Sequence, residues 1–208
     1  MTSTQTRVAL TGGIASGKSL AGELLQAKGI PVIDADHIVH QLLKQDAELK
    51  KQIHQHFGPS VFYVGPAGED EVDRSALAAL VFADARERRQ LESWIHPKVR
   101  LAINQFFEKH ASAPLVVASI PLLFEAGMAH LYDEVWLISC DEATQSARLA
   151  SHRAMTLDAA KARLASQMPL EEKKRRLLEC PRYRILDNNG TPRDLSNQVN
   201  AALADFML

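Results

Sequence analysis

A phosphate-binding pattern lies near the N-terminus of the chain. Residues 12–19 read GGIASGKS, which fits G-x-x-x-x-G-K-[ST] at every fixed position. Gly12 and Gly17 permit the backbone angles that bend a loop around an anion, so successive N–H groups point at phosphate oxygens. Lys18 is placed to reach the β- and γ-phosphates, and the Ser19 hydroxyl to bind Mg²⁺. We expect a nucleotide triphosphate to bind Gly13, Ile14, Ala15, Ser16, Gly17, Lys18, Ser19 and Leu20.

The absence of two motifs indicates which nucleotide the loop binds. A dinucleotide-binding G-x-G-x-x-G starting at Gly12 would need glycine where Ile14 stands. A GTP-dependent switch would usually carry a guanine-reading N-K-x-D motif, and the sequence contains none. By default, the nucleotide is therefore expected to be ATP.

Two carboxylates, Asp34 and Asp36, follow the second apolar run, at the edge where open α/β sheets bind ligands. A small-molecule kinase needs a carboxylate that orients the acceptor hydroxyl and takes its proton. Alternate residues of an extended strand point to opposite sides, so the two should have different tasks. We expect Asp36 to be the base and Asp34 to support Mg²⁺ or the loop. The alternative is that Asp36 only caps a helix predicted over residues 37–44.

The third predicted strand ends in Ala118-Ser119, without the Asp that many P-loop proteins place there for Mg²⁺. The magnesium ligands are then expected to be Ser19, water and the Asp34/Asp36 pair.

The elements that must position these residues are short, continuous apolar runs separated by helical stretches, which is typical of strands buried on both faces of a parallel sheet. A first helix is predicted from about Gly17 to Gly29. Between residues 38 and 110 we expect mostly helix, interrupted by an acidic loop over 58–73, and interpret this region as an inserted substrate-binding unit. The predicted strands are Val8–Leu10, Pro31–Ile33, Leu115–Ala118, Val135–Ile138 and Arg184–Leu186.

The composition of the chain excludes several classes of protein. The 208 residues are 46% apolar, which excludes a disordered or collagen-like chain and favours one domain. A formal net charge of −1 argues against a nucleic-acid or membrane partner. Cys140 and Cys180 lie in no metal-binding or disulfide pattern, and the polar N-terminus precedes no run of about 18 apolar residues. We expect a cytoplasmic protein, a monomer or small homo-oligomer.

Charge is nevertheless uneven along the chain. Residues 148–184 hold ten basic side chains against four acidic ones. This stretch is a candidate for binding a small polyanion, with Arg148 and Arg153 the favoured residues. The run Glu171–Arg176 is more typical of a solvated helix, because its acids precede its bases at the spacing of surface ion pairs.

In its ordered set of motifs the sequence resembles the dephospho-coenzyme A kinase family. The likeness covers nearly the whole chain, and its most particular segment after the phosphate loop is Pro121–Glu125. The other segments are Val32–Asp36, Val72–Arg74, Val81–Phe82, Leu91–Glu92, Ile95–Pro97, Val99–Arg100, Gln167–Lys173 and Asp187–Gly190.

The resemblance implies a three-layer α/β P-loop kinase fold with a parallel sheet, forming a single domain over residues 1–208. Its core would cover about 1–36, 112–147 and 180–208, a helical CoA-binding insertion about 37–111, and a helical lid about 148–179. With Mg²⁺, ATP would phosphorylate the ribose 3′-hydroxyl of dephospho-CoA, the final step of coenzyme A biosynthesis. Arg148, as a catalytic residue, and Arg153 would neutralise the transferring phosphoryl group from the lid. Asn188 would lie near the adenine of ATP.

Five residues depart from the family pattern. Ala15 stands where glycine is typical, Leu20 where threonine is, and Pro181-Arg182 where Ala-Asp is frequent. His40 replaces an arginine, and a mostly neutral imidazole is a weaker partner for phosphate.

The remaining substrate-side candidates, beside Asp34, each have a second interpretation. His96 either touches the acceptor or is a structural histidine starting a helix. Arg74 either meets a CoA phosphate or pairs with nearby acids, and Glu125 follows apolar residues at the ligand edge of the sheet. Aromatic residues expected in the core are Phe124, Trp94 and Trp136. Two further functions stay open: a P-loop kinase for another small hydroxyl compound, and a nucleotide-binding regulator acting through a protein partner.

Overall fold

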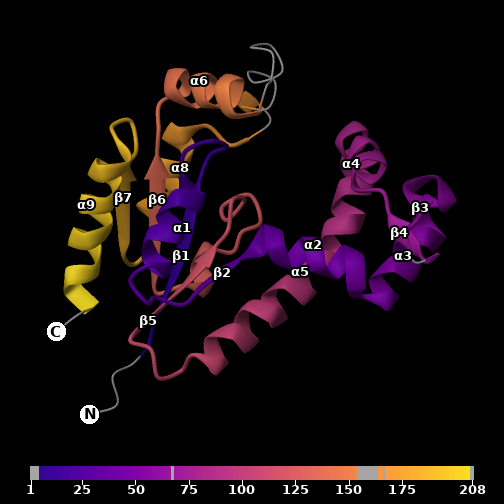
Figure 1. Ribbon diagram of the computed structural model, residues 1–208, viewed down its shortest axis with the longest axis horizontal. Helices are drawn as coiled ribbons and strands as arrows, with labels where there is room; N and C mark the ends of the chain where they lie inside the picture. The colour runs from indigo at the N-terminus through magenta and orange to yellow at the C-terminus, as the bar shows by residue number, and fades with distance from the viewer. Residues whose placement is uncertain (1–4, 67, 154–163, 166, 207–208) are drawn as a thin grey trace. The chain divides into compact units, whose positions relative to one another are not determined.

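The computed structural model describes residues 5–66, 68–153, 164–165 and 167–206. The chain forms two compact units (Figure 1), which we call the sheet unit, Met1–Asp34 with Phe106–Leu208, and the helical unit, Ala35–Gln105. In the described residues no helix is both long and apolar enough to cross a membrane.

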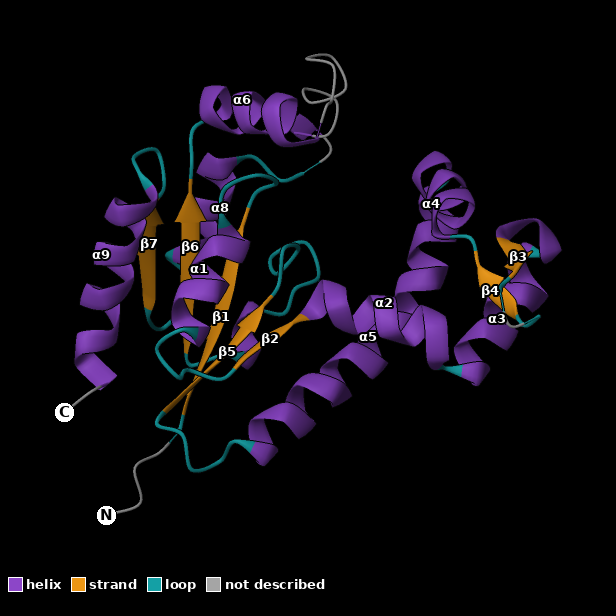
Figure 2. Cartoon of the chain, viewed as in Figure 1, coloured by secondary structure: helices purple, strands orange, loops and turns teal. Residues whose placement is uncertain are grey.

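Five parallel strands form the centre of the sheet unit, in the order β2-β5-β1-β6-β7 (Figure 2). All five coincide with predicted apolar runs. The continuous buried pattern of β5 and β6 is the pattern that predicted a sheet covered on both faces. The strands are β1 (Thr6–Gly12), β2 (Val32–Asp34), β5 (Leu115–Ser119), β6 (Glu134–Ser139) and β7 (Tyr183–Asp187).

Helices flank this sheet, which confirms the α/β fold. On one face, α1 (Lys18–Gln26) and α9 (Pro192–Leu203) bury Leu25 and Leu195 in one cluster with strand residues such as Trp136. Thr191 and Asp194 form a reciprocal capping box that fixes the start of α9. Among the residues that the structure describes, this unit also contains α6 (Glu142–Arg153), α8 (Leu170–Leu177) and the short 3₁₀ turns η2 (Ala129–Leu131) and η3 (Ala204–Phe206).

The register of the sheet brings four chemically useful strand ends to one edge. Ser119 at the end of β5 pairs with both Leu10 of β1 and Asp34 of β2. The chain then leaves β1 at Gly12 and β7 at Asp187 on the same side, as parallel pairing requires. Because β5 lies between β1 and β2, Asp34 is two strands away from the phosphate loop.

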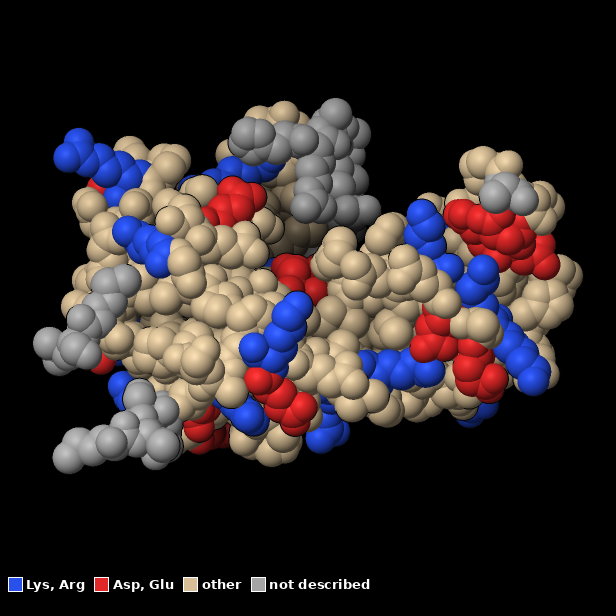
Figure 3. Space-filling model, turned by 60° about the horizontal axis from the view of Figure 1, so that its bottom comes forward, with Lys and Arg blue, Asp and Glu red and all other residues tan. Residues whose placement is uncertain are grey.

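The helical unit contains a hairpin where we predicted only an acidic loop. Strands β3 (Phe62–Val64) and β4 (Asp70–Val72) pair antiparallel within residues 58–73. The prediction was wrong because the strands are three residues long, too short for a periodicity signal, and are held by burial of Val61 and Val72. In Figure 3, acidic side chains gather over this end of the unit. Its helices are α2 (Ala35–Gln45), α3 (Ala47–Phe57), η1 (Pro59–Val61), α4 (Arg74–Ala83) and α5 (Ala85–Lys109), the last ending in the sheet unit.

Two local predictions in this unit are also wrong. Asp36 is not part of an extended strand and is not the residue that caps a helix over 37–44, because α2 begins at Ala35 and places Asp36 in its first turn. His96 does not start a helix, since α5 runs through His96 and Pro97. Proline lacks the N–H that an α-helix bonds, so the sequence pair His-Pro suggested a helix start that packing overrides.

Candidate nucleotide-binding and phosphoryl-transfer site

The phosphate loop connects β1 directly to α1 and has two left-handed residues. Gly17, immediately before the helix, has φ +97°, and Ala15 has φ +56°. The Ser16 N–H donates to Gly13 O at 3.1 Å, which closes the turn. Lys18 is the first residue of α1, so the loop ends at a helix N-terminus, whose partial positive charge favours an anion.

Asn188 supports the loop from the end of β7. Its Nδ2 donates to Ser16 O at 2.7 Å, and its own N–H donates to Ser139 O at 2.8 Å. A Cβ at Gly17 would lie 1.9 Å from Asn188 Nδ2, so glycine is required there both for its φ and for this contact. The side chain is buried, and in this structure it holds the loop backbone.

The Lys18 ammonium group is held by two side chains at the ends of neighbouring strands. Lys18 Nζ donates to Ser119 Oγ at 2.6 Å and lies 3.5 Å from Asp34 Oδ2. The Ser119 hydroxyl donates to the same Asp34 oxygen at 2.8 Å. The residue at the end of β5 thus links the loop lysine to the carboxylate two strands away.

One face of α6 points donors at the loop. Asp141 accepts a hydrogen bond from Thr144 N at the start of this helix. Hydrogen bonds from the backbone and the side chain of Thr144 lower the pKa of the Asp141 carboxyl. Three residues apart on the helix, Gln145 donates to Ile14 O at 2.8 Å and Arg148 donates to Asn188 O at 2.8 Å. A longer contact, 3.4 Å, joins Arg148 to Ala15 O.

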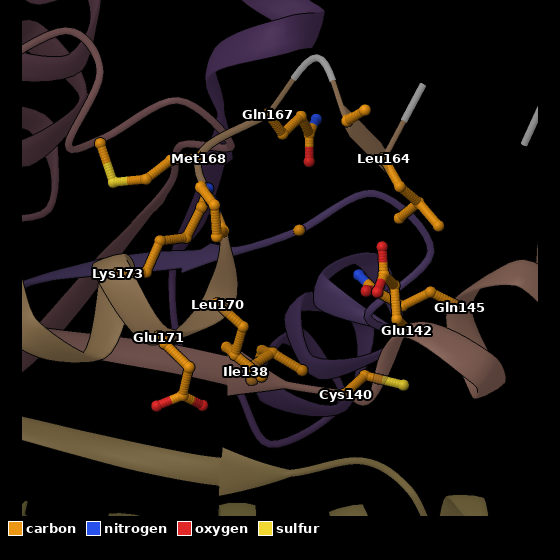
Figure 4. A pocket seen from close by; sticks show the side chains of 13 residues that line it. Ile138, Cys140, Glu142, Gln145, Leu164, Gln167, Met168, Leu170, Glu171 and Lys173 are labelled. Carbon is orange, nitrogen blue, oxygen red and sulfur yellow. The ribbon is translucent and has the colours of Figure 1, made fainter. Parts of the chain in front are cut away.

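A pocket of about 320 Å³ opens beside Gly13 (Figure 4). It is lined from β6 by Ile138, from α6 by Gln145, and from the segment before α8 by Gln167, whose Oε1 accepts from Ile14 N at 2.8 Å. Cys140 also lines it, and burial raises the pKa of its thiol, which keeps the sulfur protonated.

Glu125 forms an ion pair with Lys173, which lies in the first turn of α8. Lys173 Nζ lies 3.1 Å from Glu125 Oε1, and only 1% of the lysine side chain is exposed. The same Glu125 oxygen accepts from Met168 N at 3.3 Å. The solvated-helix interpretation of residues 171–176 is therefore wrong for Lys173.

That interpretation holds for the other charged residues of α8. Lys174 pairs with Glu171, and Arg175 and Arg176 both pair with Glu172. The two guanidinium groups lower the pKa of Glu172 to about 2.

The helical unit holds the other predicted residues. Asp36 is exposed in the first turn of α2, and one residue separates it along the chain from Asp34. Arg74 Nη1 lies 2.7 Å from His40 Nδ1. Because arginine only donates, His40 must accept through an unprotonated Nδ1. His96 is half-buried within α5.

The predicted core aromatics divide between the units. Trp136 and Phe124 are buried, as expected. Trp94 is half-buried and meets Phe57 edge-on with ring centroids 6.3 Å apart. Arg153 ends α6, and its side chain lies outside the described part of the structure, as does much of the predicted lid.

Magnesium would find oxygen ligands at Ser19 and Asp34. Ser19 is exposed in the first turn of α1, and the Asp34 carboxylate remains 39% exposed beside Lys18. Among the described residues, no group of three or more His, Cys, Asp or Glu side chains could hold a metal ion by itself. Mg²⁺ that is bound through substrate phosphates, water and one or two protein oxygens needs no such group, so these residues fit the ion.

Sequence reasoning missed Gln145, Gln167 and Lys173 as parts of this site. The two glutamines lie 131 and 153 residues from Ile14 along the chain, and no local pattern links them to the loop. Gln167 and Lys173 do stand in a segment that carried the family resemblance, which was the available signal.

Comparison with known proteins gives a consistent result over most of the chain. The sequence model of the dephospho-CoA kinase family matches residues 6–194. A dephospho-CoA kinase from Gloeobacter violaceus is 42% identical over 196 residues, covering 94% of this chain and 90% of the relative. Another, from Synechococcus sp. strain CC9605, is 44% identical over 170 residues, covering 82% of this chain and 81% of the relative. A crystal structure from Thermus thermophilus superposes with TM-score 0.81 at 30% identity, covering 99% of this chain and all of that one.

Proposed function

The chain belongs to the dephospho-CoA kinase family, and from this premise we propose that it transfers the γ-phosphoryl group of ATP to the ribose 3′-hydroxyl of dephospho-CoA. The products are CoA and ADP, and the step is the last of coenzyme A biosynthesis. The observation that carries the proposal is the phosphate loop in this family context, with Lys18 held at 2.6 Å from Ser119 and beside Asp34.

On the ATP side, residues 13–20 supply N–H groups and a helix N-terminus for the triphosphate, and Lys18 supplies a positive charge for the β- and γ-phosphates. Asn188 Nδ2 and Arg148 act on loop carbonyls, which fixes where the loop N–H groups point. Arg148 is half-buried beside the loop, so its guanidinium is placed to offset the charge that develops on the transferring group. We extend this role to Arg153 on the resemblance alone.

On the acceptor side, we assign the base to Asp36. As the bond between the 3′-oxygen and phosphorus forms and the bond from the γ-phosphorus to the β-phosphate oxygen breaks, the hydroxyl proton passes to the Asp36 carboxylate. Asp34 orients Lys18 through their contact at 3.5 Å and the bridging hydroxyl of Ser119. Arg74 with His40, His96 and Glu125 are the further candidates for contacting dephospho-CoA.

Magnesium completes the set of charges, with Ser19 and Asp34 as its protein ligands. When bound, it neutralises the β- and γ-phosphate oxygens, which a nucleophile would otherwise not approach easily. A cytoplasmic location and a monomeric or small homo-oligomeric state remain predictions from the sequence.

The deciding experiment measures ADP release by the purified chain with MgATP and dephospho-CoA. We expect ADP to form in proportion to dephospho-CoA, with one CoA for each ADP. Parallel reactions with shikimate, gluconate and nucleoside monophosphates test other hydroxyl acceptors. Turnover with one of these but not with dephospho-CoA would replace the proposed acceptor, and ATP binding without any acceptor-dependent turnover would favour a regulator.

A further inference from the structure

The peptide groups of Ile14 in the phosphate loop are held from two sides by side-chain amides. Gln145 Nε2 donates to Ile14 O at 2.8 Å, and Gln167 Oε1 accepts from Ile14 N at 2.8 Å. The first glutamine comes from α6 and the second from the segment that leads into α8 (Figure 4).

The chemistry of the backbone fixes how each amide is oriented. A carbonyl oxygen only accepts a hydrogen bond, so Gln145 must present its NH₂ group to Ile14 O. An N–H group only donates, so Gln167 must present its oxygen to Ile14 N. Gln145 is 8% exposed, and a buried amide is expected to keep its hydrogen-bond partner.

The backbone conformation of Ala15, the next residue, indicates what these contacts stabilise. Ala15 has φ +56°, which lies in the left-handed region that is strained for an L-residue with a side chain. Such a conformation persists where surrounding contacts over-determine it. Gln145 holds the peptide group between Ile14 and Ala15, and Gln167 holds the one before it, between Gly13 and Ile14.

Gly13 leaves room for this arrangement. A Cβ at Gly13 would lie 2.7 Å from Gln145 Nε2 and 3.7 Å from Gln167 Oε1. The second position of the phosphate-loop pattern is variable in general, yet here glycine allows the Gln145 amide to approach the backbone, whereas the distance to Gln167 is an ordinary van der Waals contact.

We propose that Gln145 and Gln167 are positioning residues for ATP. They hold the two peptide groups that flank Ile14, and through the second of them the left-handed Ala15, so that the loop keeps its phosphate-binding shape before the nucleotide arrives. The inference deepens the proposed function and rests on it for the identity of the nucleotide. A pre-shaped loop binds ATP more tightly because less ordering accompanies binding.

The test compares Gln145→Met with the control Gln55→Met, at an exposed glutamine of α3, in the wild-type and the Ala15→Gly backgrounds. Methionine has nearly the length of glutamine but no donor. Binding of MgATP without acceptor is measured by titration calorimetry, and KM for both substrates by the ADP assay. We expect Gln145→Met to raise the Kd of MgATP about tenfold, the scale of one lost hydrogen bond, with KM for dephospho-CoA within about twofold.

Glycine at position 15 should rescue the variant, because glycine adopts φ +56° without strain. In that background the same Gln145→Met substitution should raise the Kd by about threefold or less. A merely structural role for Gln145 would lower the melting temperature without this interaction between the two sites.

Two outcomes would overturn the proposal: an unchanged Kd in Gln145→Met, or an equal penalty with and without Ala15→Gly. Should Gln145→Met not fold, Gln167→Met applies the same test to the Ile14 N–H, with the same two outcomes. Because binding is measured without acceptor, a wild-type chain that is inactive on dephospho-CoA would contradict the proposed function while leaving this result readable.

Discussion

Lys18 Nζ lies 2.6 Å from Ser119 Oγ, so the loop lysine is held by a hydroxyl where many P-loop proteins have a carboxylate. Ser119 accepts from the lysine and donates to Asp34, and both bonds are compatible because a hydroxyl does both. The negative charge that balances Lys18 therefore comes from β2 and not from β5.

Ser119→Ala should lower kcat/KM for ATP about tenfold or more, since hydrogen bonds to charged groups contribute roughly 1.5–3 kcal/mol. Ser119→Thr keeps the hydroxyl and serves as the control, with activity close to wild type. Steady-state kinetics with varied ATP checks both. Equal activity of the alanine and threonine variants would remove the bridge from the mechanism.

Asp36→Asn should lower kcat by at least about 10²-fold, the scale of general-base catalysis, while ATP binding stays nearly intact. Asp34→Asn is the matched comparison: because Asp34 lies beside Lys18, its main effect should be on KM for ATP. Measuring kcat, KM and the Kd of MgATP for both variants separates the two roles. Unchanged turnover in Asp36→Asn would exclude it as the base.

Ala15→Gly should stabilise the protein. Glycine relieves the left-handed strain but adds freedom to the unfolded chain, so the net gain is about 0.5–1 kcal/mol. For a chain of this size we expect a rise in melting temperature of roughly 1–4 °C, measured by calorimetry without nucleotide. Ala21→Gly in the middle of α1 is the opposite control and should be destabilising. A lower melting temperature in Ala15→Gly would mean that φ +56° is not strained.

Lys173→Met should lower the free energy of unfolding by about 1–3 kcal/mol, because Glu125 loses the ammonium group that it faces at 3.1 Å. Glu125→Gln in the same chain should recover part of that loss, since no unpaired charge then remains. Urea unfolding of the two single variants and the double variant measures the coupling. Strictly additive effects would contradict the ion pair.

Asp46 gives a dependence of stability on pH. Burial alone would raise its pKa, but the hydrogen bond from Lys98, at 2.7 Å, and those from backbone N–H groups lower the pKa overall. A carboxyl whose pKa is lower in the folded state contributes stability above its unfolded pKa of about 3.9, and this contribution disappears as the pH falls through the folded value.

Asp46→Asn keeps an oxygen that accepts from Leu49 N but cannot pair with Lys98. At pH 7 the variant should therefore be less stable by up to about 1 kcal/mol, the range for partly exposed ion pairs. Urea unfolding between pH 7 and pH 3 should show this difference shrinking below pH 4. A difference that is constant with pH would mean that ionisation of Asp46 does not matter.

The sequence predicts the framework of the sheet unit well because its signals are local. The five strands are continuous apolar runs, and the loop at 12–19 has fixed residues at fixed spacing. Parallel pairing then requires Asp34 and Ser119 to share an edge with the loop. What could not be predicted is the bridge itself, because it depends on β5 lying between β1 and β2, an order that local patterns do not contain.

In the helical unit, local signals were weak or misleading. The Val61 and Val72 side chains anchor a hairpin that has too few residues for an alternating pattern. Pro97 lies inside α5 because packing of Ile95 and Val99 on the buried face outweighs one missing backbone bond. Pairings such as Arg74 with His40, 34 residues apart, are products of tertiary structure.

The support that Asn188 gives to Ser16 spans 172 residues of sequence. During synthesis the loop leaves the ribosome long before the strand that braces it, and β1 emerges well before its neighbours β5 and β6. A nascent or prematurely terminated chain that ends before residue 188 would carry the complete loop motif but lack one of its braces. Competence to bind ATP firmly would thus require synthesis at least as far as residue 188, which separates such chains from shorter fragments.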